Sequence, residues 1–129
     1  MKILIVEDSI AMRRVIRNTI SRFYPDTTYE EAQNGTEALD ILKLEPIDFV
    51  ITDWIMPVFD GIELTKEIRE TLENKTLPIL MITTKGSKAD IIEAIQAGVN
   101  DYLVKPLSPN ILEAKLKVLV EKFELNKAN

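Results

Sequence analysis

Short apolar runs alternate with longer amphipathic segments along the chain. Five runs have the length of strands, at positions 2–6, 27–32, 49–52, 78–83 and 101–105. The run at 49–52 carries no charged residue, as expected for a strand that is buried on both faces of a sheet. The run at 27–32 is more polar and is predicted to lie at the sheet edge, where polar side chains are tolerated. This alternation is typical of βαβ units with a parallel sheet.

Helix signals fill the intervals between these runs. Ser9 is the predicted N-cap of a helix whose inner face is given by residues at helical spacing: Met12, Val15, Ile16, Thr19, Ile20 and Phe23. Ser87 and Asp90 have the spacing of a capping box, and Gly98 is placed to stop the helix that follows them. Further helices are expected after Asn34-Gly35, from Ile62 to Leu72, and from Pro109 to about Phe123. The predicted fold is α/β, a doubly wound five-stranded parallel sheet with helices on both faces.

Composition narrows the possible functions. The 129 residues suit a single domain, predicted over residues 1–125 with a short tail at 126–129 and no output domain. A net charge of −5 argues against nucleic-acid binding, which requires a surplus of Lys and Arg. The apolar runs are far shorter than the ~20 residues that cross a bilayer, so no membrane segment is expected. Cysteine and histidine are absent, which excludes disulfides, thiolate chemistry and histidine ligands. We expect a cytoplasmic protein.

Polar side chains stand where the predicted strands end. Glu7 and Asp8 follow the first run, Asp53 follows the third, and Thr83 and Lys105 end two others. In an open parallel sheet the carboxyl ends of the strands form the ligand crevice, so these side chains are expected to converge. Two like charges about 4 Å apart repel by roughly 4 kcal/mol at an effective dielectric of about 20. Clustered carboxylates therefore favour a bound cation, and Mg²⁺ prefers oxygen ligands of this kind.

The same set of side chains is suited to phosphoryl transfer. A carboxylate such as Asp53 can act as a nucleophile and form an aspartyl-phosphate. Lys105 and the hydroxyl of Thr83 can stabilise phosphoryl oxygens. Each feature alone has a simpler interpretation: Glu7-Asp8 as an ordinary acidic helix N-terminus, and Lys105 as an ion-pair partner. Together they provide the positioning and charge neutralisation that dominate this reaction.

These motifs make the chain resemble the receiver domains of bacterial response regulators, over about residues 1–125. The matching residues are Glu7-Asp8, Asp53 with Met56-Pro57 and Gly61, Thr83, and Lys105-Pro106. Among receivers the chain is most similar to single-domain chemotaxis regulators. That closer likeness lies in Glu7-Asp8-Ser9 with Met12-Arg13-Arg14, in the segment 53–57, and in the segment 97–102. The resemblance implies a strand order of 2-1-3-4-5, which is the order of the family and which the residues by themselves leave open.

The resemblance also implies residue roles. Asp53 would accept a phosphoryl group from the phosphohistidine of a chemotaxis-type histidine kinase or from a small acyl phosphate. One Mg²⁺ per chain would be bound by Asp8, Asp53, the backbone carbonyl of Ile55, and Glu7 through a water molecule. The phosphoryl oxygens would be held by Lys105, Thr83 and the backbone amide of Thr84. The Lys105-Pro106 peptide bond would be cis.

Switching and partners follow from the same resemblance. Phosphorylation adds roughly −1.5 to −2 charge, which would draw Thr83 inward and let Tyr102 rotate into the space behind it. Without the resemblance, Tyr102 is better interpreted as an interfacial aromatic residue. The output surface would be the fourth helix, fifth strand and fifth helix, with Tyr102 and Lys115 as contacts. The expected partners are the kinase, a flagellar motor switch protein and a possible phosphatase, and the chain is expected to be a monomer.

Other functions fit less well. A phosphorelay shuttle that passes the group to a histidine phosphotransfer protein is the alternative within the family. A phosphohydrolase of the haloacid dehalogenase type would need a second acid at Ile55, so the chain is not expected to be an enzyme beyond its own phosphorylation and dephosphorylation. A flavodoxin-like cofactor site is disfavoured because Glu7-Asp8 would repel a phosphate. No GxxxxGK[ST] loop is present, and the few residues after the last helix leave no room for a DNA-binding module.

Two positions depart from the familiar chemotaxis pattern. Ile55 stands where a polar amide is familiar and Lys85 where an acid is familiar, so the phosphoryl lifetime cannot be carried over. Trp54 is expected to be a partly exposed neighbour of the site. A basic stripe on the first helix is expected to be a solvated face unless a kinase docks there. Its members are Arg13, Arg14, Arg17 and Arg22.

Overall fold

Five parallel strands form one sheet in the order β2-β1-β3-β4-β5. The strands are β1 (Lys2–Val6), β2 (Thr28–Ala32), β3 (Phe49–Thr52), β4 (Ile79–Thr83) and β5 (Asp101–Val104). All four pairings between neighbouring strands are parallel. The computed structural model describes the backbone of residues 1–128 and the side chains of residues 1–124. The predicted sheet and its strand order are confirmed.

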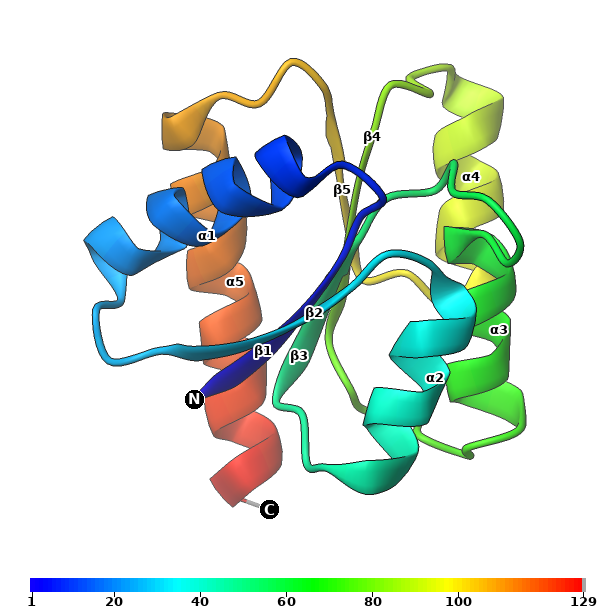
Figure 1. The fold of residues 1–129 in the computed structure, drawn as a ribbon, viewed down its shortest axis with the longest axis horizontal. Helices are drawn as coiled ribbons and strands as arrows, with labels where there is room; N and C mark the ends of the chain where they lie inside the picture. Colours follow the sequence, from blue (N-terminus) through cyan, green and yellow to red (C-terminus); the bar gives the residue numbers. More distant parts are fainter. Residues whose placement is uncertain (129) are drawn as a thin grey trace.

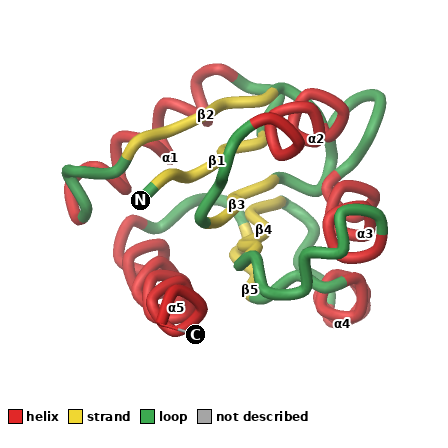
Figure 2. Tube along the Cα trace, turned by 90° about the horizontal axis from the view of Figure 1, so that it is seen from below, coloured by secondary structure: helices red, strands yellow, loops and turns green. Residues whose placement is uncertain are grey.

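Five helices cover the two faces of this sheet. They are α1 (Ile10–Phe23), α2 (Gly35–Leu44), α3 (Gly61–Glu70), α4 (Lys88–Ala97) and α5 (Pro109–Ala128). α1 and α5 lie on one face, and α2, α3 and α4 lie on the other (Figures 1 and 2). α5 continues beyond the predicted end near Phe123, into the segment predicted to be a tail. None of the described helices combines the length and apolar composition needed to cross a bilayer.

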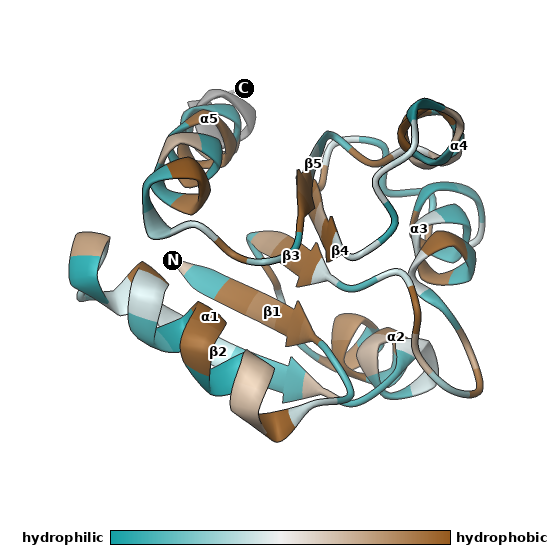
Figure 3. Ribbon diagram, turned by 90° about the horizontal axis from the view of Figure 1, so that it is seen from above, coloured by the Kyte–Doolittle hydropathy of each residue, from teal (hydrophilic) through white to brown (hydrophobic). Residues whose placement is uncertain are grey.

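The central strands contribute side chains to two separate hydrophobic cores, one on each face of the sheet. Ile3 and Ile5 of β1 pack toward α1 and α5, whereas Leu4 and Val6 pack toward α2 and α3. Because successive side chains of a strand point to opposite faces, both faces of a central strand must be apolar. Figure 3 shows this as hydrophobic strands inside and a more hydrophilic β2 at the edge. The continuous apolar runs of the sequence are therefore explained by burial on both faces.

Side-chain N-caps start α1 and α4 within a few residues of the carboxyl ends of the preceding strands. The Ser9 side chain accepts a hydrogen bond from the amide of Met12 at the start of α1. The predicted capping box of Ser87 and Asp90 is confirmed, and Gly98 ends α4 in the left-handed region with φ of 118°. A helix therefore starts close to the end of the strand before it.

The helical periodicity misplaces some side chains. It predicts Val15 on the inner face of α1, but Val15 is 46% exposed. On α4, Ile92 and Ile95 are about half exposed, although their spacing is that of an amphipathic helix. Arg13, predicted to belong to a solvated stripe, is buried. α1 packs against β1 and α5, and α4 packs against β5 and α3, so these neighbours decide which residues of the two helices are buried.

Gly61 lets α3 begin directly against the backbone of Asp53. The amide of Gly61 donates to the carbonyl oxygen of Trp54 at 2.8 Å. A Cβ atom on Gly61 would lie only 2.1 Å from the carbonyl oxygen of Asp53. The start of α3 and the position of Asp53 are therefore coupled through direct backbone contact.

We expect Gly61→Ala to lower the free energy of unfolding by roughly 2–3 kcal/mol, because overpacking forces the backbone of α3 or Asp53 to move. Urea unfolding followed by circular dichroism measures this loss. Gly86→Ala is the control, since its nearest contact is the Val104 side chain at 3.1 Å. We expect it to cost under about 1 kcal/mol. Equal losses in the two variants would contradict the close approach of α3 to Asp53.

Candidate functional site

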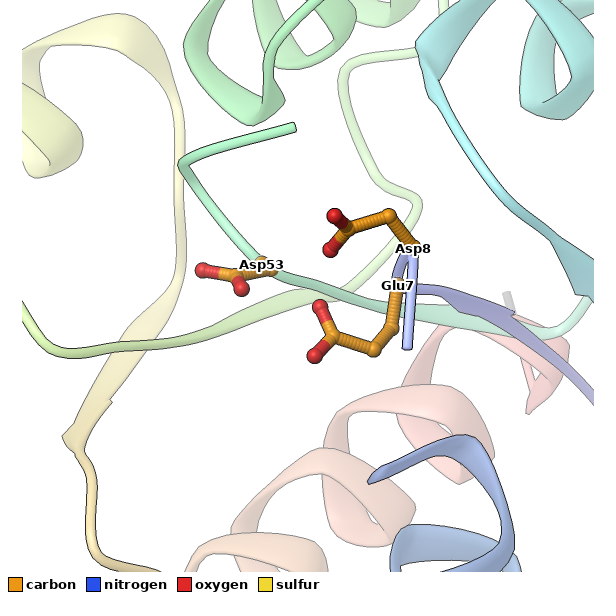
Figure 4. A group of neighbouring side chains, drawn as sticks. All are labelled: Glu7, Asp8 and Asp53. Atoms are coloured by element: carbon orange, nitrogen blue, oxygen red, sulfur yellow. The ribbon is translucent and has the colours of Figure 1, made fainter. Parts of the chain in front are cut away.

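The predicted site residues meet at the carboxyl edge of the sheet. β1 and β3 pair with Val6 opposite Thr52, so the residues that follow these strands lie side by side. The amide of Asp53 donates to the carbonyl oxygen of Val6 at 2.9 Å, which continues that pairing by one residue. In Figure 4 the side chains of Glu7 and Asp8 extend from the end of β1 toward Asp53. The expected convergence of the three acids is confirmed.

The three carboxylates form a compact oxygen cluster. One oxygen from each of Glu7, Asp8 and Asp53 lies within 4.8 Å of the others. Glu7 and Asp53 are buried, whereas Asp8 is exposed. Glu7 Oε2 is a buried oxygen without a hydrogen-bond partner among the described residues. Oxygen donors, an unpartnered buried oxygen and an exposed side fit a hard divalent cation that keeps some of its waters.

Lys105 balances part of this negative charge. Its Nζ lies 3.0 Å from Asp53 Oδ2 and 3.2 Å from Glu7 Oε1. Burial alone would lower the pKa of Lys105, but the hydrogen bonds and charges of Asp53 and Glu7 outweigh burial and raise that pKa. Lys105 therefore stays protonated in the site. The predicted cis bond between Lys105 and Pro106 is present.

The pKa of Glu7 is raised even though Lys105 lies close to its carboxylate. Burial raises the pKa of Glu7, and the neighbouring carboxylate of Asp53 raises it further. Lys105 acts in the opposite direction without cancelling these effects, so the pKa reaches about 7. Without a further cation, Glu7 therefore holds its proton at mildly acidic pH.

Both oxygens of Asp53 have defined partners. Oδ1 accepts a hydrogen bond from the amide of Trp54 at 2.6 Å, and the amide of Ile55 is 3.4 Å away. Oδ2 accepts from Lys105. The Ile55 side chain, two residues beyond, is 57% exposed. Asp53 is thus held firmly from the backbone side, next to a surface that a partner can reach.

The threonines lie next to the acids without bonding to Asp53. Thr83 is fully buried at the end of β4, and its hydroxyl oxygen is 3.4 Å from the donating amide of Lys85. Thr84 is exposed. Within the part of the chain that the structure describes, neither forms a hydrogen bond with Asp53. Their expected contacts with phosphoryl oxygens stay predictions.

Lys85 covers the side of the site formed by Trp54. The expectation that Trp54 is partly exposed is wrong, because Trp54 is only 5% exposed. Lys85 Nζ lies 3.9 Å from the centroid of the Trp54 ring and 3.9 Å from Asp90 Oδ1. The side chain therefore makes a cation–π contact beside Asp53. Spacing along the sequence does not indicate this contact.

The backbone of Lys85 also holds Tyr102. The hydroxyl of Tyr102 donates to the carbonyl oxygen of Lys85, and the ring is buried. Burial, together with the negative charges of Asp90, Asp53 and Glu93, raises the pKa of Tyr102 to about 12. Tyr102 thus occupies an inward position in this structure, and its rotation on phosphorylation stays a prediction. Lys115, the other expected contact, pairs with Asp101 at 2.7 Å.

Sequence reasoning misses the role of Arg13. The side chain is predicted to lie in a solvated stripe, yet its guanidinium is buried and bonds to the backbone carbonyl of Glu7. Its other partner is Glu31, a residue of β2 whose position cannot be placed from spacing alone. Only the pairing of β1 with β2 brings these residues together.

Comparison with known proteins agrees with this geometry. The chain matches the response regulator receiver domain over residues 3–117. It is 48% identical over 118 residues to the chemotaxis protein CheY homolog of Campylobacter jejuni, covering 91% of this chain and 90% of that protein. It is 47% identical over 122 residues to chemotaxis protein CheY1 of Helicobacter pylori, covering 93% and 97%. The crystallised CheY4 of Vibrio cholerae superposes with a TM-score of 0.82 at 35% identity, covering 92% and 97%.

The chain therefore belongs to the response regulator receiver domain family, whose members act in two-component signalling. Within that family its named relatives are chemotaxis proteins of the CheY type. It is a CheY-like receiver, and the acidic cluster fits the Mg²⁺ pocket of such domains.

We expect the metal-free protein to lose stability as the pH rises from 4.5 to about 7, the ordinary and folded pKa values of Glu7. Between these values the folded state holds a proton that the unfolded chain has released, so raising the pH favours unfolding. Urea unfolding in EDTA at about pH 5 and about pH 8 measures the change. Glu7→Gln removes this titration and should lose less stability over the interval. The same pH dependence in both proteins would contradict the assignment.

Proposed function

We propose that this chain is a phosphorylation-activated switch whose phosphoacceptor is Asp53. The observation that carries the proposal is the Asp53 carboxylate, fixed between the Trp54 amide and Lys105 beside two further acids. Asp8, Asp53 and the backbone carbonyl of Ile55 would hold Mg²⁺, with Glu7 acting through a water. Bound Mg²⁺ would neutralise charge on the transferring group.

The chemistry is a transfer from nitrogen to oxygen. A carboxylate oxygen of Asp53 attacks the phosphorus of a phosphohistidine on a chemotaxis-type histidine kinase, and the phosphorus–nitrogen bond breaks as the imidazole leaves. Lys105 then moves from the carboxylates to a phosphoryl oxygen, aided by Thr83 and the amide of Thr84. Hydrolysis, alone or with a phosphatase, resets the site. The chain catalyses only these reactions on itself.

The output surface lies on α4, β5 and α5. Apolar side chains are exposed on all three elements, which supports docking of another protein. They are Ile92 and Ile95 of α4, Val104 of β5, and Ile111 and Val118 of α5. Lys85 links this surface to the site, because its carbonyl holds Tyr102 and it follows Thr83 by two residues. A shift of Thr83 toward the phosphoryl group would therefore reposition Tyr102.

A flagellar motor switch protein is the proposed partner of this surface, because the named relatives are chemotaxis proteins. The chain would act in the cytoplasm as a monomer, as a receiver unit over residues 1–125. The alternative is a phosphorelay shuttle to a histidine phosphotransfer protein, favoured by the accessible surface around Ile55.

Incubation with acetyl phosphate and Mg²⁺, followed by intact mass measurement, tests the phosphoacceptor. We expect a mass gain of one phosphoryl group in the wild type and none in Asp53→Ala, because the nucleophile is absent. Asp40→Ala is the matched control, since Asp40 is an exposed aspartate of α2 outside the site, and it should still gain the group. A gain in Asp53→Ala, or a gain unaffected by EDTA, would contradict the proposal.

Binding of a motor switch peptide tests the output. We expect phosphorylation to tighten binding and Ile95→Ser to weaken it roughly tenfold, the loss of about 1.4 kcal/mol of apolar contact. Val15→Ser is the control, because Val15 is similarly exposed but lies on α1. Binding that ignores phosphorylation, together with rapid transfer to a histidine phosphotransfer domain, would favour the relay instead.

A further inference from the structure

Arg13 differs from its neighbour on α1. Arg13 is 8% exposed, whereas Arg14 is exposed. A buried guanidinium is costly unless its donors are paired, so its partners indicate what the side chain is for. One partner is the carboxylate of Glu31, and the other is the backbone carbonyl of Glu7, which belongs to the site.

The guanidinium bonds to two acceptors from two strands. Nη1 donates to the backbone carbonyl oxygen of Glu7 at 2.6 Å, in a buried position at the end of β1. Nε donates to Glu31 Oε1 at 3.0 Å, which ties the same group to β2. The planar fork of arginine can serve both acceptors at once, which the single ammonium group of lysine cannot do in the same geometry.

The carbonyl that Arg13 holds belongs to the peptide between the two acids. The amide of Glu7 donates to the carbonyl oxygen of Ala32 at 3.0 Å, and its carbonyl accepts from Arg13. The main chain of Glu7 is thus fixed by β2 on one side and by α1 on the other. The orientation of this peptide sets the directions in which the Glu7 and Asp8 side chains leave the backbone.

Glu31 is itself held in place. Its second oxygen accepts from Arg17 Nη1 at 3.2 Å, and the Arg17 guanidinium lies 5.0 Å from the centroid of the Tyr29 ring. Glu31 also lies opposite Ile5 of β1 in the sheet register. Glu31 is thus shared between Arg13 and Arg17, and it fixes the Arg13 guanidinium against the Glu7 carbonyl oxygen.

We infer that Arg13 is a positioning residue of the Mg²⁺ site, holding the Glu7–Asp8 peptide so that both carboxylates face Asp53. The inference rests on the proposed function, because Mg²⁺ is the ion that the carboxylates would bind. Arg13 bonds to the backbone carbonyl of Glu7 and to Glu31, so it would set metal affinity without being a ligand. Groups that orient metal ligands commonly matter in this way.

Mg²⁺ titration followed by the fluorescence of Trp54 tests the inference in three variants. Arg13→Met and Arg13→Lys should each weaken Mg²⁺ binding by at least about tenfold, as when groups that orient metal ligands are lost. Arg14→Met is the matched control, because it removes the same charge one residue away at an exposed position, and its affinity should stay at the wild-type value. If Arg13→Met does not fold, Arg13→Lys, which keeps the charge, carries the test.

A second measurement needs no metal. The ¹⁵N and ¹H shifts of the Asp8 amide in EDTA should change in both Arg13 variants and not in Arg14→Met, because this amide shares a peptide with the Glu7 carbonyl. Wild-type affinity in Arg13→Lys, or equal weakening in Arg13→Met and Arg14→Met, would overturn the positioning role. A wild-type protein that does not bind Mg²⁺ would instead overturn the proposed function.

Discussion

Three carboxylates share one corner of the sheet, and their mutual repulsion is the constraint on which the site depends. Folding brings Glu7, Asp8 and Asp53 together because β1 and β3 are adjacent and end at the same edge. Lys105 compensates two of the three acids directly. The cost is visible in Glu7, whose pKa is raised to about 7 by burial and then by the neighbouring Asp53, and whose Oε2 has no partner among the described residues. Such a site gains free energy from a divalent cation and tolerates an incoming phosphoryl group only when cations offset its charge.

The same corner is connected to the surface proposed for output. The segment after β4 makes contacts in two directions, since the Lys85 side chain lies over Trp54 beside Asp53 and the Lys85 carbonyl accepts from Tyr102. A change in charge at Asp53 therefore acts on a segment that also holds Tyr102 on β5. A ligand shifts such an equilibrium only by its differential affinity for the two arrangements, so the strength of this connection limits the switch.

Much of the fold could be predicted because the central strands are buried on both faces. β1, β3 and β4 are continuous apolar runs in the sequence, and the acids that follow β1 and β3 indicate the site by their positions along the chain. The strand order is implied by the family resemblance and is confirmed. The helical pattern is less informative on α1 and α4, where Val15 and Ile95 are exposed although they are apolar. Periodicity identifies an apolar face but does not show whether another element covers it.

The features that could not be predicted depend on partners distant in sequence. Arg13 is buried because Glu31, on the adjacent strand, and the Glu7 carbonyl accept its hydrogen bonds. Trp54 is buried partly because Lys85 covers its ring. In both cases a charged side chain changes role through a contact that only the three-dimensional fold creates.

The most direct test of the central claim is the free energy of unfolding with and without Mg²⁺, in the wild type and in Asp8→Ala. The account predicts that Mg²⁺ at about a hundredfold excess over its dissociation constant stabilises the wild type by roughly 2.7 kcal/mol, with little effect on the variant. A wild type whose stability does not respond to Mg²⁺, or a variant that gains as much, would contradict it.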